Sequence, residues 1–331
     1  MKSLHRYILS SFLLCVTISC AGSDGPSSST GETDRSYRDR MRQFVISISK
    51  HAPPSFIIIP QNGQELLTNQ LAGEERTDDY LAAIDATGRE DLFYGYSGDN
   101  EPTPAEDTDC MCELLDIGEA AGIRSLVTDY CWTKSKMDDS YRENSAKGYL
   151  SFAADSRGLD TIPAYPAEPY GAHSGNVTSM DDVKNFLYLI DPSGFQTKDA
   201  FLAALENTDY DLLIIDAFYD DTMLIPEEVQ RLRTKRNGGT RLVVSYMSIG
   251  EAEDYRYYWN DSWDTDPPFW LGSENPHWEG NYKVRYWDSE WQSVIFGSDD
   301  AYLDRIIASG FDGVYLDIID AFEYYEQEKD I

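Results

Sequence analysis

The chain has 331 residues, of which 41% are hydrophobic and 13% aromatic, so it can bury a full core. Its 59 Asp and Glu residues outnumber 27 Lys and Arg, which gives a formal net charge of −32. So acidic a protein is not expected to bind nucleic acid, because phosphate contacts need a basic surface. A cationic ligand would be attracted to it.

The first 20 residues have the layout of a secretory signal. Lys2 and Arg6 precede an apolar segment, Tyr7 to Ile18, that is too short to span a bilayer. The stretch from Thr17 to Cys20 resembles a bacterial lipobox, with Thr where Leu is commoner at the first position.

This resemblance implies cleavage before Cys20 and lipidation of that residue, so we expect an exported, membrane-anchored lipoprotein at the cell surface or in the periplasm. An ordinary signal peptide cut nearby is the alternative. Residues 21–35 are rich in Ser, Gly, Thr and acids, which predicts a flexible stalk.

The remaining cysteines are too few for a disulfide framework, with Cys110 and Cys112 two apart and Cys131 alone. The four histidines are scattered and form no zinc signature. No Gly-rich phosphate loop and no Gly-x-Ser-x-Gly elbow occur. We therefore expect neither a metal nor a cofactor.

Short apolar runs alternate with amphipathic helical patterns along residues 36–331. The predicted strands are Phe56–Pro60, Leu81–Ala86, Ile123–Thr128, Gly148–Ala153, Phe186–Ile190, Leu212–Ile215, Leu242–Ile249 and Val314–Leu316. The predicted helices include Pro104–Ala121, Lys198–Glu206, Pro226–Arg236 and Asp300–Ser309. Alternation of this kind favours an α/β fold with a parallel sheet.

Most of these strands run into polar residues, many of them acids, at their C-terminal ends. About eight such units fit one (β/α)8 TIM barrel over residues 36–331, whose active site would lie at those ends. A doubly wound open sheet is the alternative, but it lacks a nucleotide fingerprint. Two features are unusual: a helix at Tyr37–His51 precedes every strand, and Asp160 to Met180 forms a long Pro/Gly/Ser-rich loop.

The stretch from Gly310 to Asp320 carries the most informative carboxylate. Val314 to Ile319 reads as a buried parallel strand interrupted by Asp317. An acid there is costly unless it ends the strand and faces a pocket, so Asp317 is placed for chemistry. The alternative is that Asp317 caps the next helix.

Two long motifs resemble the endo-α-1,4-polygalactosaminidase family, glycoside hydrolase family 114. They are the stretch Ser245 to Glu253, followed by Tyr255, Arg256 and Trp259, and the stretch Gly310 to Asp320. Pro60 to Gly63 and Glu90 to Tyr94 are further matches. The resemblance implies a glycosidase barrel acting on an amino-sugar polymer.

The order of these motifs differs from the family's. Family members begin at the strand that matches Phe186–Ile190 and reach the Gln-Asn-Gly and Glu-Asp segments last, whereas here those segments come first. This predicts a circular permutation, in which residues 161–182 join the family's usual C- and N-terminal ends. Permutation is tolerated where chain ends are close and exposed.

In family order Asp317 ends the fourth strand and Glu90 the sixth, positions that carry the two carboxylates of other retaining α-glycosidase barrels. By this analogy Asp317 is the nucleophile and Glu90 the acid/base with a raised pKa. Glu90 could instead be a surface acid. Glu251 is the first substitute in either role, and its alternative role is an ion pair with Arg256.

The predicted substrate-binding residues lie at the same strand ends or in the aromatic segment after Glu251, where rings could stack on sugars. They are Asp216, Asp129, Tyr130, Gln61, Asn62, Tyr246, Arg157, Asp320 and Trp287. The seven tryptophans include six between residues 259 and 291, some of which must belong to the core.

We therefore expect a monomeric, lipid-anchored endo-acting glycosidase that cleaves an α-linked galactosamine or N-acetylgalactosamine polymer. A glycan-binding lipoprotein that has lost catalysis on the same barrel is the alternative. A third interpretation is a barrel enzyme that binds Mg²⁺ or Ca²⁺ through its aspartates.

Overall fold

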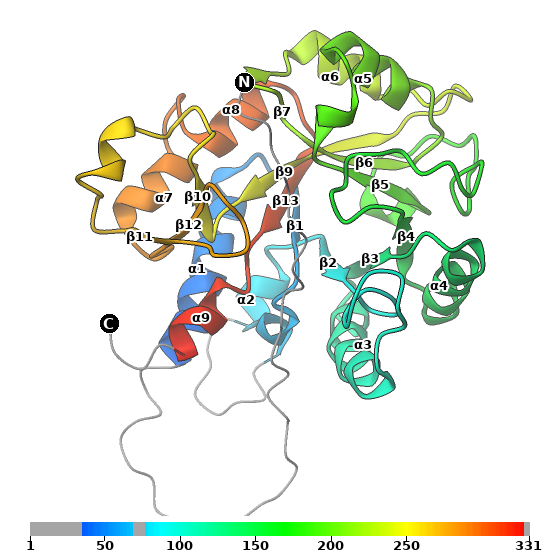
Figure 1. The fold of residues 1–331 in the computed structure, drawn as a ribbon, viewed down its shortest axis with the longest axis horizontal. Helices are drawn as coiled ribbons and strands as arrows, with labels where there is room; N and C mark the ends of the chain where they lie inside the picture. The colour runs from blue at the N-terminus through cyan, green and yellow to red at the C-terminus, as the bar shows by residue number, and fades with distance from the viewer. Residues whose placement is uncertain (1–34, 69–76, 328–331) are drawn as a thin grey trace, which may run out of the picture.

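The computed structural model describes residues 35–68 and 77–327 (Figure 1). The predicted signal segment, most of the stalk and Cys20 lie outside these residues. Within the described ranges, no helix combines the length and the apolar character that crossing a membrane requires.

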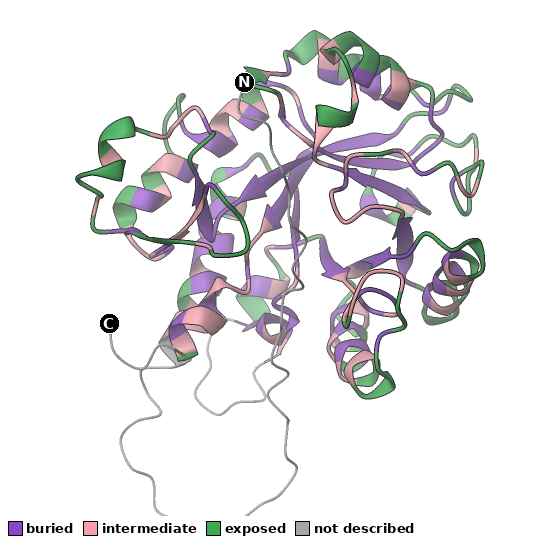
Figure 2. Cartoon of the chain, viewed as in Figure 1, coloured by how far each residue is buried: buried purple, intermediate pink, exposed green. Residues whose placement is uncertain are grey.

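Two parallel sheets form the centre of the described chain, which confirms the predicted α/β class. One has the strand order β1-β13-β9-β6-β5 and the other β2-β3-β4. Their bounds are β1 (Ile57–Pro60), β2 (Ala86–Glu90), β3 (Arg124–Tyr130), β4 (Leu150–Ala154), β5 (Phe186–Leu189), β6 (Leu212–Asp216), β9 (Leu242–Ser248) and β13 (Gly313–Asp317). The strands are buried almost throughout (Figure 2), as their apolar runs predict.

The pairing of β1 with β13, predicted from the sequence, is confirmed: Ile58 lies opposite Val314 in a parallel ladder. One predicted strand is misplaced. Residues of the Leu81–Ala86 run belong to the end of helix α2 (Thr77–Leu81) and a turn, and β2 begins only at Ala86. An apolar run this short does not distinguish a helix end from a strand.

Side chains from the two edges of the larger sheet reach each other. Tyr188 on β5 donates a hydrogen bond of 3.0 Å to Oε1 of Gln61, directly after β1. A bridge between Gln61 and Gly88 joins β1 to β2, and the rings of Phe152 on β4 and Phe186 on β5 lie 5.8 Å apart. In the described chain β4 and β5 make no ladder. The two sheets thus curve around a common interior.

Helices cover the outside of these sheets (Figure 1). The longer ones are α1 (Arg35–His51), α3 (Ala105–Ala120), α4 (Lys134–Lys147) and α5 (Lys198–Glu206). The shorter ones are α6 (Pro226–Leu232), α7 (Ser289–Ile295), α8 (Tyr302–Ala308), α9 (Ala321–Gln327) and the 3-10 turns Gln64–Leu67, Met180–Asp182, Pro192–Gly194 and Asp261–Asp264. All five helices predicted from the sequence are present, within a few residues of their expected ends.

Helix α1 buries Met41, Phe44, Val45 and Ile48 in the core and lies beside α9. Arg38 on α1 forms an ion pair of 2.9 Å with Glu326 on α9. The first and last described helices are therefore neighbours, although they are far apart in sequence.

A small antiparallel sheet follows β9, with the order β10-β12-β11 (Glu251–Glu253, Asn281–Val284 and Leu271–Glu274). A hairpin of β7 (Phe218–Tyr219) and β8 (Thr222–Met223) follows β6. The aromatic segment is only partly a surface, because Trp270 and Trp291 are buried in the core, whereas Trp278 is exposed.

The loop that begins at Asp160 contains turns and bends up to Ser179, and the 3-10 turn Met180–Asp182 follows it. A buried ion cluster fixes it to the rest of the protein. Asp211, just before β6, accepts a hydrogen bond of 2.8 Å from Lys235 Nζ and contacts His173 Nε2 at 2.9 Å. Lys235 also donates to the carbonyl of His173, so this segment is held in one place.

Candidate active site

Asp317 is the last residue of β13, and its carboxylate is held by two donors. The hydroxyl of Tyr246 donates to Oδ2 at 2.7 Å, and the backbone N–H of Ile318 donates to Oδ1 at 2.8 Å. Burial, followed by the charge of Glu90, raises the pKa of Asp317 to about 8, against the opposing effect of these donors. Asp317 therefore holds its proton at neutral pH.

Glu90 is the last residue of β2 and is also held by two donors. Asn62 lies beyond the end of β1, and its side-chain Nδ2 donates to Oε2 of Glu90 at 3.3 Å. The side-chain Oδ1 of Asn62 accepts from the backbone N–H of Glu90 at 3.2 Å. The hydroxyl of Tyr130, at the end of β3, donates to Oε1. Burial raises the pKa of Tyr130 well above its usual range, so this hydroxyl remains a donor.

Strand β1 lies between β13 and β2, so Asp317 and Glu90 end two strands separated by one. The influence of Glu90 on the pKa of Asp317 shows that the two groups share an electrostatic environment. We assign the raised pKa to Glu90 from the sequence, whereas the structure places a large rise on Asp317.

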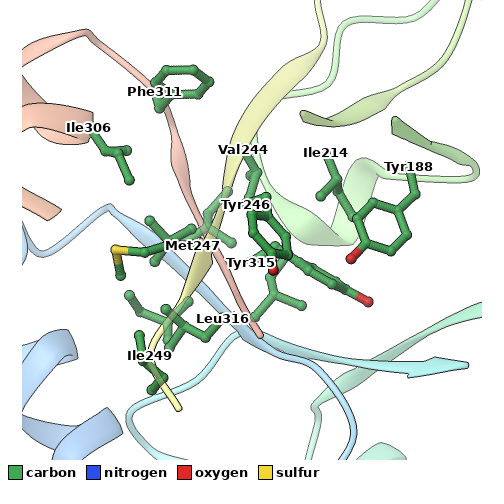
Figure 3. Packing of buried hydrophobic residues seen from close by; sticks show 14 of the residues in the cluster. Tyr188, Ile214, Val244, Tyr246, Met247, Ile249, Ile306, Phe311, Tyr315 and Leu316 are labelled. Carbon is green, nitrogen blue, oxygen red and sulfur yellow. The ribbon is translucent and has the colours of Figure 1, made fainter. Parts of the chain in front are cut away.

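Three buried tyrosines, Tyr188, Tyr246 and Tyr315, lie together among the core residues of the larger sheet (Figure 3). The rings of Tyr188 and Tyr315 lie 5.0 Å apart, and burial raises the pKa values of Tyr188, Tyr246 and Tyr315 well above 10. Gly88 on β2 makes room for Tyr315, since a Cβ there would lie 2.0 Å from the tyrosine oxygen. The glycine at position 88 weakens the sequence signal for a strand at β2.

Three non-glycine residues in the left-handed region follow the strand ends of this site. Asn62, Asp91 and Ile318 have φ of 59°, 62° and 58°. A β-branched residue such as Ile318 rarely adopts this conformation, and strain of this kind concentrates at functional sites. The left-handed conformation changes the direction of the chain directly after Gln61, Glu90 and Asp317.

Two further carboxyl groups lie on the segment after Asp317. Burial, then the charge of Glu65, raises the pKa of Asp320 to about 6, with Glu90 and Glu251 contributing. Burial, then the charge of Asp320, raises the pKa of Glu323 to about 8. Asp320 therefore belongs to the surroundings of the pair, as predicted.

Glu251 is also buried, and its charge acts on Asp320. Its Oε1 accepts from Asn275 at 2.9 Å and contacts Lys283 at 3.5 Å, so the alternative pairing with Arg256 is absent. Its Oε2 is buried without a hydrogen-bond partner. The neighbouring Gly250 admits the backbone of Ile318, whose carbonyl oxygen would lie 2.1 Å from a Cβ.

Asp216 lies at the end of β6, but its carboxylate is already engaged. Arg256 binds both oxygens, at 2.9 and 2.8 Å, and also pairs with Glu253 at 2.7 Å. This buried cluster ties the loop after β9 to the end of β6. The predicted contact of Asp216 with substrate would require Arg256 to move.

Asp129 is not at the strand-end site, contrary to the prediction. It precedes Tyr130 on β3, so strand alternation directs it to the opposite face, against helix α4. There it is fully buried and accepts from the backbone of Phe93 and the side chains of Ser140 and Asn144, at 2.8, 2.6 and 3.1 Å.

Two other predicted residues also differ in place. Trp287 packs with Tyr37 and Tyr325, at ring distances of 5.0 and 4.7 Å, so it lies against α1 and α9. Arg157 binds Asp91 rather than either catalytic candidate. Gln61, by contrast, reaches Tyr188 in the interior, in the same group as Asn62 and Tyr246.

Three side chains were missed by sequence reasoning. Tyr188 and Tyr315 lie within apolar runs, where only the hydroxyl distinguishes them from core residues. Trp132 follows β3 two residues after Tyr130 and is 55% exposed, with its backbone N–H bound to Asn100 at 3.1 Å. An exposed tryptophan beside strand ends had no periodic signal to reveal it.

Among the described residues, no group of three or more His, Cys, Asp or Glu side chains is arranged to hold a metal ion. The site consists of two carboxyl groups, of which Asp317 is protonated at neutral pH, with neutral hydroxyl donors beside them, at the C-terminal ends of parallel strands. Such a pair can donate a proton to a leaving group and supply a carboxylate on the same substrate, which is the chemistry of a hydrolase of acetals.

Comparisons with known proteins agree with that class. Residues 192–331 match the model of glycoside-hydrolase family GH114, which confirms the predicted resemblance over this part of the chain. The matched range contains Asp216, Glu251 and Asp317, and Glu90 lies outside it.

Three relatives, each described only as an uncharacterised protein, show similar matches. One from Methanocaldococcus jannaschii is 42% identical over 155 residues, covering 46% of this chain and 42% of the relative. One from Thermotoga maritima is 40% identical over 40% of each chain, and one from Deinococcus radiodurans is 41% identical over 38% of each. The chain thus spans less than half the length of each relative.

Proposed function

We propose that this protein is an endo-acting glycoside hydrolase in which Asp317 and Glu90 are the two catalytic carboxyl groups. The observation that carries the proposal is the placement of these two groups at the ends of β13 and β2, on either side of β1, each held by a tyrosine hydroxyl. The family resemblance of residues 192–331 supports the same reaction class.

The reaction needs one acid and one carboxylate. One group gives its proton to the glycosidic oxygen as the bond to the anomeric carbon breaks. The other carboxylate either attacks that carbon or takes a proton from the attacking water, depending on whether the carboxyls stand about 5–5.5 Å or about 6.5–9.5 Å apart. Tyr246 and Tyr130 hold the two groups in place.

We propose an α-linked polymer of galactosamine or N-acetylgalactosamine as the substrate. The support is the resemblance to polygalactosaminidases and the acidity of the chain, with Asp320 in the surroundings of the pair and a formal net charge of −32. Carboxylates attract the ammonium groups of free amino sugars.

The test is mass spectrometry of oligomers released from deacetylated and acetylated polygalactosamine. Asp317→Asn and Glu90→Gln should each lower activity by about a thousandfold or more, since each removes one member of the carboxyl pair. Glu206→Gln, which removes a carboxylate from an exposed ion pair with Arg231, is the matched control and should keep full activity.

Full activity in Asp317→Asn would discard this mechanism. If the wild type binds these polymers and releases no oligomers, the glycan-binding alternative replaces the enzyme.

We also propose that the eight parallel strands form a closed (β/α)8 barrel in permuted order. Starting at β5, the spatial order is β5, β6, β9, β13, β1, β2, β3 and β4, which is the chain order broken once between β13 and β1. The family model matches only residues 192–331. This restriction supports the proposal, because a colinear comparison aligns only one part of a permuted chain.

Export and anchoring through Cys20 are proposals from the sequence alone. Changing Cys20 to Ala should release the protein from membranes or leave an unprocessed precursor. Membrane fractionation with globomycin-treated cells as a comparison measures this, and an unchanged distribution would exclude lipidation at Cys20.

A further inference from the structure

Arg157 is the centre of a contact network in the loop after β2. Its guanidinium binds both oxygens of Asp91 at 2.7 and 3.2 Å, Oδ1 of Asp99 at 2.6 Å and the carbonyl oxygen of Gly95 at 3.1 Å. The side chains of Arg157, Asp91 and Asp99 are 19%, 19% and 16% exposed. Arg157 comes from the segment after β4, and its side chain holds three residues of the loop after β2 together.

The flat face of the same guanidinium lies on the ring of Tyr130, with 3.9 Å between its central carbon and the ring centroid. Cation–π contact at this distance restricts the ring's position. The hydroxyl of Tyr130 donates to Glu90, and Asp91, which Arg157 binds, follows Glu90 directly in the left-handed conformation. Arg157 thus acts on Glu90 from two directions without binding it.

We propose that Arg157 is a positioning residue for the catalytic pair, which sets the orientation and charge of Glu90 through Tyr130 and Asp91. The proposal deepens the proposed function and rests on it. Lysine could keep the charge but not the fork or the stacked plane, because only the guanidinium has both.

The groups that act on Glu90 come from several elements. They are Asn62 after β1, Asp91 after β2, Tyr130 on β3, Arg157 after β4, Tyr188 on β5, Tyr315 and Asp317 on β13, and Asp320 after it. The acids and Glu90 repel one another, while Arg157 is the cation in this group and Tyr130 the donor it orients.

Arg157→Lys should therefore lower kcat by about tenfold, with little change in KM, because the fork and the stack on Tyr130 are lost. Both limbs of the pH profile of kcat/KM should move to higher pH by about one unit, since a misplaced Tyr130 stabilises the ionised pair less well. Tyr130→Phe should move the profile in the same direction.

The double variant separates positioning from general support of the fold. Because Arg157 acts partly through Tyr130, Arg157→Lys combined with Tyr130→Phe should lose less activity than the two single losses combined, so the effects are not additive. The matched control is Arg231→Lys, which alters the exposed ion pair between Arg231 on α6 and Glu206. It should leave kcat and the pH profile of kcat/KM unchanged.

Additive losses, or a lower unfolding temperature with an unmoved pH profile, would overturn the proposal and leave Arg157 a purely structural residue. If the wild type hydrolyses no glycan, the proposed function fails by itself. Carbon-13 titration of the Glu90 carboxyl group in the full chain then decides the inference: a higher midpoint in Arg157→Lys supports it, and an unchanged midpoint refutes it.

Discussion

Asp317 makes the fold less stable whenever it is ionised. Its pKa is raised to about 8 in the folded protein, mainly by burial, whereas an unfolded chain ionises near pH ~3.9. Between these values the folded state binds a proton that the unfolded state has released. The free energy of unfolding must therefore fall as pH rises through this window, by at most ~1.4 kcal/mol per pH unit from this group, and level off above it.

Asp317→Asn tests this directly, because the amide is neutral at every pH in the window. The variant should match the wild type in stability near pH 4 and exceed it at pH 8, the opposite of the usual effect of a core substitution. Urea unfolding at pH 4, 5, 6, 7 and 8 measures the difference. A constant difference across this series would mean that Asp317 does not titrate in the folded protein as proposed.

Single residues of the site differed in how well the sequence revealed them. Asp317 could be predicted, because a carboxylate that interrupts an apolar run is costly without a reason. Asp129 was predicted wrongly, because the sequence places it one residue from Tyr130 but cannot give the face of the strand. Arg157 was predicted to bind substrate, but the structure shows it bound to Asp91 and Asp99, which lie about 60 residues away in sequence.

At the level of elements, the strands with continuous apolar runs were predicted well. Buried parallel strands such as β6 and β9 are apolar on both faces, so the sequence signal is strong. Strand β2 was misplaced because its sequence, Ala-Thr-Gly-Arg-Glu, contains no run of large apolar residues. Gly88 leaves room for the side chain of Tyr315, and Glu90 ends the strand at the candidate site.

The connections between elements could not be predicted in the same detail. The loop after β9 is held by the buried cluster of Arg256, Asp216 and Glu253, and the loop after β4 by Lys235, Asp211 and His173. Each cluster joins residues from distant parts of the chain. Hydrophobic periodicity carries no information on such pairs, although a charged residue beside an apolar run suggests that some partner exists.

At the scale of the whole molecule, chain order and spatial order can be separated. The proposed barrel order is broken only between β13 and β1, and the chain segments on either side of that break meet where Arg38 pairs with Glu326 and Tyr37 stacks near Tyr325 at 5.5 Å. A short linker could join these two helices. The loop from Asp160 to Met180, which has no regular element until its last residue, could be cut with little loss of secondary structure.

A rearranged chain tests the permutation. It would run from residue 178 to 327, then through a short Gly/Ser linker into residues 35–160. If the parallel strands form one closed ring, this chain should fold with a far-ultraviolet circular dichroism spectrum like that of the wild type. The loss of His173 exposes one side of the Lys235–Asp211 pair and should lower the unfolding temperature by several degrees.

The matched control cuts the chain within β6, between Ile214 and Ile215, which removes continuity from a central strand and should prevent folding. The rearranged order should also align colinearly with its relatives beyond the range of 192–331 matched now. Failure of the rearranged chain to fold under conditions where the native order folds would show that the break between β13 and β1 is not a mere difference in chain order, and the permutation would have to be abandoned.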